Sequence, residues 1–189
     1  MKLYEKYPDA VEINGWVFPL DLDFRNVIRA FDIQDEEGWT VRDKLELQCK
    51  LLLKDPDDCP ATMMEMAALL EAIFALFPKK ESDDRERFID FHQDASAIRS
   101  GFSRLGIDLT RDRLHFFRFL ELLSDLPEDS ALMRTIDIRS KPMPKATAHN
   151  HEQIAALQKA KARVALKLTD EERMRSFAKA LKNSTILRG

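Results

Sequence analysis

Apolar residues recur along most of this chain at the spacing of an α-helix, in which every third or fourth side chain lies on the same face. In residues 21–34 the apolar positions are Phe24, Val27, Ile28 and Phe31, at i, i+3, i+4 and i+7. Comparable patterns predict five more helices, over 40–54, 61–77, 86–104, 108–125 and 128–136. The pattern therefore predicts a mostly α-helical protein, built as a compact multi-helix bundle.

Capping and breaking residues coincide with the ends of these predicted helices. Asp21 or Asp23 can cap the first helix, and Asp108 or Thr110 can cap the fifth. The second helix begins at Thr40, after the interruption at 38–39, and the pair at 55–56, Asp-Pro, ends it.

The N-terminal residues show the alternation of a small β-hairpin instead. Two short segments, 11–13 and 16–18, flank Asn14-Gly15, a pair that tolerates the positive φ angles of a two-residue turn. A lone hairpin is marginally stable in water, so its apolar side chains should pack against helices. The side chains expected to do so are Ile13, Trp16 and Phe18.

The C-terminal quarter of the chain has a different pattern, which we interpret as an arm. Two closely spaced prolines make 140–145 a linker, because proline opposes both helix and central strand. Residues 151–167 are rich in Ala, Gln and Lys, which favours a helix but supplies no core face. A capping box at 169–172 opens a last helix that runs to about Leu181. We therefore expect a helical body, 1–140, and a basic helical arm, 141–189, that becomes ordered on a partner.

Charge separates the same two regions. The net charge is −3, but residues 141–189 hold eleven Lys/Arg against four Asp/Glu, a balance of +7. Residues 1–140 hold nineteen against twenty-nine, a balance of −10. This asymmetry suggests that the arm binds an acidic protein surface, such as the body of another copy. Self-association of that kind should weaken when residues 141–189 are deleted and in high salt.

No pattern in the sequence matches a known kind of active site. The five glycines are scattered, so they form neither a phosphate-binding loop nor a nucleophile elbow. His149 and His151 could bind a metal, but two ligands are too few, and a solvated linker is the better interpretation. Cys49 and Cys59 should both be reduced thiols. We therefore expect no catalytic residue, no metal and no cofactor.

Membrane and nucleic-acid functions are also disfavoured by composition. The chain has no long uncharged apolar run, and its first six residues are too charged for a signal peptide. We therefore expect a protein that stays in the cytosol where it is made. The arm's lysines and arginines could neutralise phosphates, but Phe177 is its one aromatic residue, and the acidic body would repel a duplex.

The helix 61–77 carries a cluster of methionines whose role has two interpretations. Ordinary core packing is the default, and an adaptable groove for helical partners is the alternative. The candidate partner-binding residues are those of this helix and of the arm: Met63, Met64, Met66, Leu70, Phe74, Lys159, Arg163, Lys167, Arg173 and Phe177.

Several short motifs occur in a characteristic order across the body. They are Ile-Asn-Gly at 13–15 leading to Asp-Phe-Arg at 23–25, then 90–95, 106–109, 114–119, 122–127 and 136–139. Over about residues 8–140 they resemble the family of small phage proteins called gene product fifteen, from tailed phages and prophages of Gram-positive bacteria. The family often has Trp after the motif histidine, whereas this chain keeps an aromatic residue, Phe116. The motif residues carried over are Phe91, Gln93, Asp94, Gly106, His115, Phe117 and Pro127.

This resemblance implies a function in phage tail assembly. Family members typically lie between the tail-tube gene and the tape-measure gene, which implies a non-enzymatic chaperone that coats the tape-measure protein while the tube polymerises. Two alternatives stay open: a structural tail component, such as a connector or completion protein, or a small nucleic-acid-binding regulator. The motif residues are not catalytic, and either helix packing or partner binding would explain them.

Overall fold

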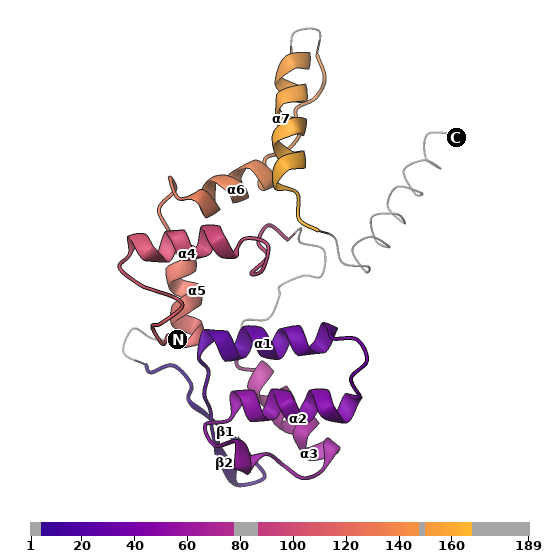
Figure 1. The fold of residues 1–189 in the computed structure, drawn as a ribbon, viewed down its shortest axis with the longest axis vertical. Helices are drawn as coiled ribbons and strands as arrows, with labels where there is room; N and C mark the ends of the chain where they lie inside the picture. The colour runs from indigo at the N-terminus through magenta and orange to yellow at the C-terminus, as the bar shows by residue number, and fades with distance from the viewer. Residues whose placement is uncertain (1–4, 78–86, 148–149, 168–189) are drawn as a thin grey trace, which may run out of the picture.

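The helices of this protein form two groups that are stacked along its long axis (Figure 1). The structure, a computed structural model, describes residues 5–77, 87–147 and 150–167. The first group contains the hairpin and three helices: β1 Ala10–Ile13, β2 Trp16–Pro19, α1 Phe24–Asp35, α2 Val41–Leu52, the short 3-10 helix η1 Pro56–Asp58, and α3 Met63–Phe74. The second group contains α4 Ala95–Arg104, α5 Phe116–Ser124, α6 Ala131–Ser140 and α7 His151–Val164. The predicted mostly α-helical fold with a small N-terminal hairpin is confirmed.

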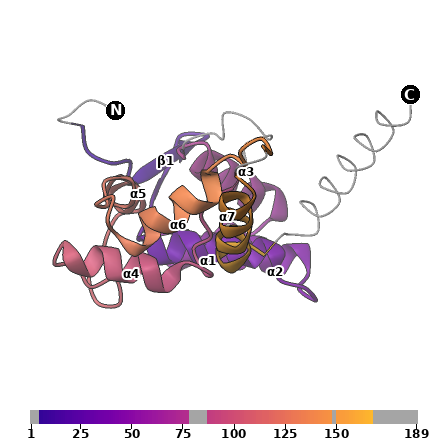
Figure 2. The ribbon, with the colours of Figure 1, turned by 90° about the horizontal axis from the view of Figure 1, so that it is seen from above.

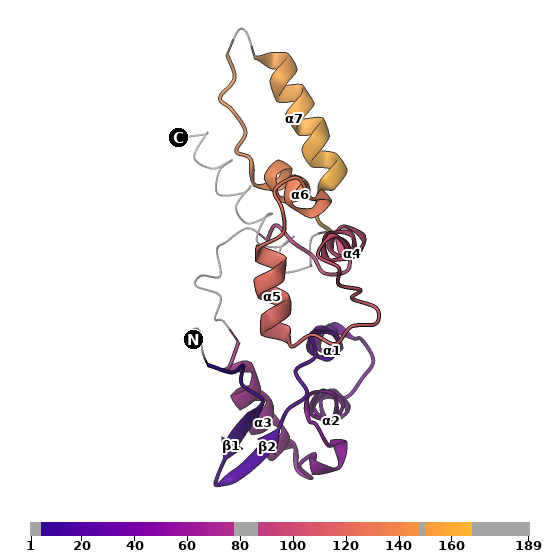
Figure 3. The same cartoon turned by 90° about the vertical axis from the view of Figure 1, so that its left-hand side faces the viewer.

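The hairpin forms as the sequence predicts, but one of its side chains lies elsewhere. β1 and β2 pair antiparallel, and Asn14 and Gly15 take positive φ angles of 52° and 82°. The expectation that Trp16 packs against a helix is wrong, because its side chain is 75% exposed. The physical reason is its position beside the turn: α3 packs against β1, while the tip of the hairpin extends past α3 (Figure 3).

Helices α1, α2 and α3 begin at side-chain caps. Asp23, and not Asp21, caps α1 by accepting a hydrogen bond from the backbone N–H of Arg25. Thr40 and Thr62 each form a capping box, in which the threonine hydroxyl and an acidic side chain three residues later bind each other's backbone N–H. Helix α2 packs against both α1 and α3 and buries Gln48, Cys49 and Leu52.

Helices α4 and α5 are shorter than the apolar pattern predicts. In 87–94, expected to be helical, the carboxylate of Asp90 instead accepts the backbone N–H groups of His92 and Gln93. Such side-chain turns compete with a helix for the same backbone donors. Asp108 likewise holds a turn through Thr110, so α5 is capped by His115, seven residues further on.

An aromatic cluster centred on α5 joins the two groups of helices. The ring of Phe119 is 1% exposed and stacks on Phe24 of α1 and on Phe102 of α4, with centroids 4.7 and 5.2 Å apart. Phe91 meets the same ring edge-on at 5.9 Å. Viewed along the long axis, α4 and α5 lie to one side and α2 and α3 to the other (Figure 2). Phe119 therefore occupies the place where the two groups share one core.

The arm is described only in part. Residues 141–147 carry no helix or strand and are exposed, and α7 packs against α6. The predicted last helix, from 169 to about 181, lies outside the described residues. The division into a body and an arm at residue 140 stays a prediction.

Replacing Phe119 with alanine should destabilise the whole fold. Loss of a fully buried phenylalanine costs about 3–5 kcal/mol in free energy of unfolding, and here it also removes contacts from both helix groups. The matched control is Met64→Ala in α3, because Met64 is exposed. Chemical denaturation followed by circular dichroism measures both variants. Equal midpoints for the two would contradict the central role of this ring.

Candidate docking site for the C-terminal arm

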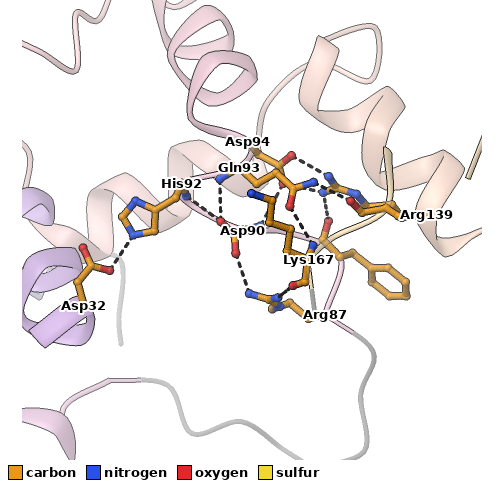
Figure 4. A network of polar contacts seen from close by, with 10 residues as sticks. Asp32, Arg87, Asp90, His92, Gln93, Asp94, Arg139 and Lys167 are labelled. Atoms are coloured by element: carbon orange, nitrogen blue, oxygen red, sulfur yellow. Dashed lines mark hydrogen bonds and ion pairs between the residues drawn. The ribbon is translucent and has the colours of Figure 1, made fainter. Parts of the chain in front are cut away.

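The residues at 87–94, which we call the docking loop, lie where α4, α6 and residues 164–167 of the arm meet (Figure 4). Two aspartates shape this loop. Asp90 accepts the backbone N–H groups of His92 and Gln93, at 2.9 and 2.7 Å, and Asp94 accepts the N–H of Asp90 at 3.0 Å. Burial raises the pKa of Asp90, but these two backbone donors and the nearby Arg87 outweigh it and hold that pKa below its ordinary value.

A buried ion pair joins the docking loop to α6. Asp94 binds the guanidinium of Arg139 with two hydrogen bonds, of 2.6 and 2.9 Å, and the two side chains are only 6% and 7% exposed. The same guanidinium donates to the carbonyls of Phe88 at 2.8 Å and Val164 at 2.6 Å. Charge-assisted, bidentate bonds of this kind are stronger than neutral ones and fix geometry in a plane. Arg139 therefore ties the loop, α6 and the end of α7 together.

The side chain of Gln93 binds the main chain of the arm. Its amide nitrogen donates to the carbonyl of Ala165 at 2.7 Å, and its amide oxygen accepts from the backbone N–H of Lys167 at 3.0 Å. Arg87 donates to the carbonyl of Lys167 at 2.9 Å. The Gln93 amide thus takes the place that a peptide group of a neighbouring strand would take. Figure 4 shows these contacts converging on the loop.

His92 links the docking loop to the first helix group. Its Nε2 atom lies 2.7 Å from Oδ1 of Asp32 in α1. That hydrogen bond raises the pKa of His92 above its ordinary value, and burial opposes it less strongly. Both side chains are substantially exposed, so the pair adds a modest, titratable link.

A second polar junction joins the segment before α1 to the segment before α5. The backbone N–H of Phe24 donates to the carbonyl of Leu114 at 2.9 Å, and that of Phe116 donates to Leu22 at 2.7 Å. Asp23 stands between them with a side chain 4% exposed. Burial raises the pKa of Asp23, but the side-chain and backbone hydrogen bonds from Arg25 outweigh it and hold the pKa below its ordinary value.

The motif histidine, His115, lies in this second junction. Its Nδ1 atom accepts the backbone N–H of Phe117, so its proton must lie on Nε2, which donates to the carbonyl of Pro8 at 3.1 Å. Tyr7 stacks on the imidazole with ring centroids 4.9 Å apart. His115 and Phe117 therefore pack against Tyr7 and hold the N-terminal segment against α5.

The other motif residues divide between packing and docking. Phe91 packs against Phe119, Gly106 takes a φ of 76° at the turn after α4, and Pro127 is half-buried. Gln93 and Asp94 bind the arm and Arg139, as described above. The sequence motifs included Arg139 at the end of 136–139 but gave no sign of its partner, because Asp94 lies 45 residues earlier.

The methionine cluster of α3 is split between core and surface. Met66 and Leu70 are buried, and Phe74 stacks on Phe31 with centroids 5.6 Å apart. Met63 and Met64 are 41% and 82% exposed. Core packing therefore applies to Met66, Leu70 and Phe74, and the adaptable groove stays a prediction for Met63 and Met64.

The candidate residues of the arm fall in two classes. Lys159, Arg163 and Lys167 are exposed, whereas Arg173 and Phe177 lie outside the described residues. A further arm lysine, Lys161, was not among these partner-binding candidates, and its ammonium donates to the carbonyl of Arg139 at 2.8 Å.

Within residues 5–77, 87–147 and 150–167, no group of three or more potential ligands is placed to hold a metal ion. None of the helices in those ranges is both long and apolar enough to cross a membrane. Both cysteines are free thiols, and burial raises the pKa of Cys49 to about 12.

Replacing Asp94 with asparagine should destabilise the protein strongly. The side chain keeps its size but leaves the Arg139 charge buried without its counter-ion, which costs about 3–5 kcal/mol in free energy of unfolding. Asp129→Asn is the matched control, since Asp129 pairs with Arg104 in a solvent-exposed bridge. Denaturant titrations of both variants check this. A midpoint for Asp94→Asn as close to wild type as that of the control would contradict it.

The His92–Asp32 link should depend on pH in a defined direction. Because the folded-state pKa of His92 is raised, the link stabilises the folded protein fully at pH values below the unfolded-state pKa of about 6.5. That contribution is lost as the pH rises through the folded-state pKa. An NMR titration of the His92 ring should give a pKa above the ordinary value in wild type and in Asp129→Asn. In Asp32→Asn the pKa should fall back, and a titration unchanged by this substitution would rule out the link.

Comparisons with known proteins place this chain in a family. Residues 3–166 match the family described as Bacteriophage Gp15 protein, which spans both groups of helices and the docking loop. Neither a curated protein nor a solved structure matches the chain. The family is a structural one and is not known to be enzymatic. The chain belongs to the bacteriophage Gp15 protein family, a family of structural, tail-related phage proteins.

Proposed function

We propose that this protein is a tail assembly chaperone that acts in the host cytoplasm and binds the tape-measure protein while the tail tube polymerises. Membership in a structural, tail-related phage family supports a role in tail assembly. The observation that carries the binding function is a set of exposed large apolar side chains near the starts of α2 and α3, which we call the apolar patch. It consists of Trp39, Val41, Met63 and Met64.

The apolar patch lies where α2 and α3 begin. These two starts are neighbours, because Arg42 of α2 donates to the carbonyl of Ala61, just before α3, at 3.5 Å. Val41 opens the apolar stripe of α2, yet its side chain is 65% exposed. Large apolar side chains that gather on a surface are typical of binding sites.

The chemistry of the patch suits a helical partner. Methionine is flexible and polarizable, so exposed methionines adapt to different apolar side chains along one helix. Trp39 adds a large, stiff surface that loses little conformational entropy on binding. A coating chaperone must cover many different segments of one long protein, and an adaptable patch meets this requirement better than a closely shaped pocket.

Binding to the tape-measure protein can be tested with one pair of variants. The protein is co-expressed with the tape-measure protein encoded beside it, and the complex is measured by affinity pull-down and light scattering. Met64→Asp places a charge in the patch and should weaken binding about tenfold or more, equivalent to about 1.4 kcal/mol. The matched control is Met143→Asp, in the exposed linker after α6, which should bind as wild type.

Two results would contradict this function. Equal binding by the two variants would remove the apolar patch from the interaction. Absence of any complex, with the protein instead present in purified particles by mass spectrometry, would favour a structural tail component that stays in the virion.

A further inference from the structure

The docking loop binds the arm through main-chain atoms. Arg139, Gln93 and Arg87 donate to the carbonyls of Val164, Ala165 and Lys167, respectively. The oxygen of Gln93 accepts the N–H of Lys167. These bonds hold the main chain of 164–167, which is the last residue of α7 and the three residues that follow it, at four points. Every copy of this chain carries both this segment and the site that binds it.

Elsewhere the described arm contacts the body along one side of α7, which packs against α6 and whose Lys161 donates to the carbonyl of Arg139. In the described part of α7 no residue is buried. The connection from α6 is exposed throughout 141–147, and its hydrogen bonds are local, as between Asn150 and the carbonyl of Lys145. The described arm is therefore held to the body at α7 and at 164–167, whereas the connection 141–147 adds no buried contact.

We propose that the docking loop of one copy binds the 164–167 segment of a second copy, so that neighbouring copies exchange arms. The exchanged contacts are the same ones that close within a single chain, so exchange sacrifices none of them. Exchange costs the entropy of association. That cost falls as the concentration of copies approaches the effective concentration of the chain's own arm, which the linker sets and which is millimolar for short flexible linkers. The arm's +7 and the body's −10 favour the contact between copies as well as within one.

Arm exchange gives the proposed chaperone a means of self-association. Only the biological purpose of arm exchange rests on the proposed function, because copies lined up along one tape-measure protein would be close enough to exchange arms. The contact itself is a property of the chain alone and can be tested without the partner.

Isotope mixing distinguishes exchange from closure within one chain. Equal amounts of ¹⁵N-labelled and unlabelled full-length protein are incubated together at high concentration. A carbodiimide then joins lysine amines to carboxylates, and mass spectrometry identifies cross-links between peptides containing 87–94 and peptides containing 161–167. Exchange predicts cross-links that contain one labelled and one unlabelled peptide, and their share should rise with concentration. Cross-links between peptides of the same label alone, at every concentration, would overturn the proposal.

A matched pair of glutamine variants tests whether the docking loop causes the exchange. Gln93→Ala removes the two amide contacts with the arm, while Gln153→Ala changes an exposed glutamine of α7. Circular dichroism should show both folded. Gln93→Ala should lower the share of mixed cross-links several-fold and reduce the mass measured by light scattering at high concentration. The proposal fails if the two variants behave alike.

The outcomes separate this inference from the proposed function. If the protein exchanges arms but does not bind the tape-measure protein, the inference stands and the proposed function fails. If the protein binds the tape-measure protein but gives no mixed cross-links, the proposed function stands and the inference fails, because each arm then binds the docking loop of its own chain.

Discussion

The second half of this structure depends on one buried ion pair, between Asp94 and Arg139. Removing two charges from water costs several kcal/mol for each ion, and their attraction offsets this only with good geometry and further hydrogen bonds. Here the pair is bidentate, and both partners have additional bonds to the main chain. Those bonds come from the docking loop and from the end of α7. The ion pair is therefore favourable only when loop, α6 and arm are all in place, which makes their assembly cooperative.

The two helix groups meet through a different kind of interaction. Phe119 provides apolar contact with rings from α1, α4 and the docking loop, and the two backbone bonds between 22–24 and 114–116 align the segments beside it. Burial of large rings is not directional, whereas backbone hydrogen bonds are. Together they fix both the closeness and the register of the groups. The family motifs around Asp23 and His115 lie in this junction.

The proposed functions use surfaces at different places in the same fold. The apolar patch lies at the starts of α2 and α3, in the first helix group, and the docking loop lies in the second group, beside α4 and α6 (Figure 1). A partner held on the patch therefore does not compete for the docking loop. This separation would let one copy bind a long protein and a neighbouring copy at the same time, which is what a coat requires.

The sequence by itself determined the features that depend on neighbouring residues. Asn14-Gly15 fixed the turn of the hairpin, and the threonines before α2 and α3 fixed where those helices begin, because turns and caps are decided within a few residues. Local side-chain turns also decided the start of α4, because Asp90 and Asp94 take backbone donors within four residues although apolar spacing continues through 87–94. Tertiary structure alone decided that Trp16 is exposed and that Arg139 meets Asp94. The spacing of apolar residues shows which side chains share a helix face, but it does not show which distant residue pairs with a buried charge.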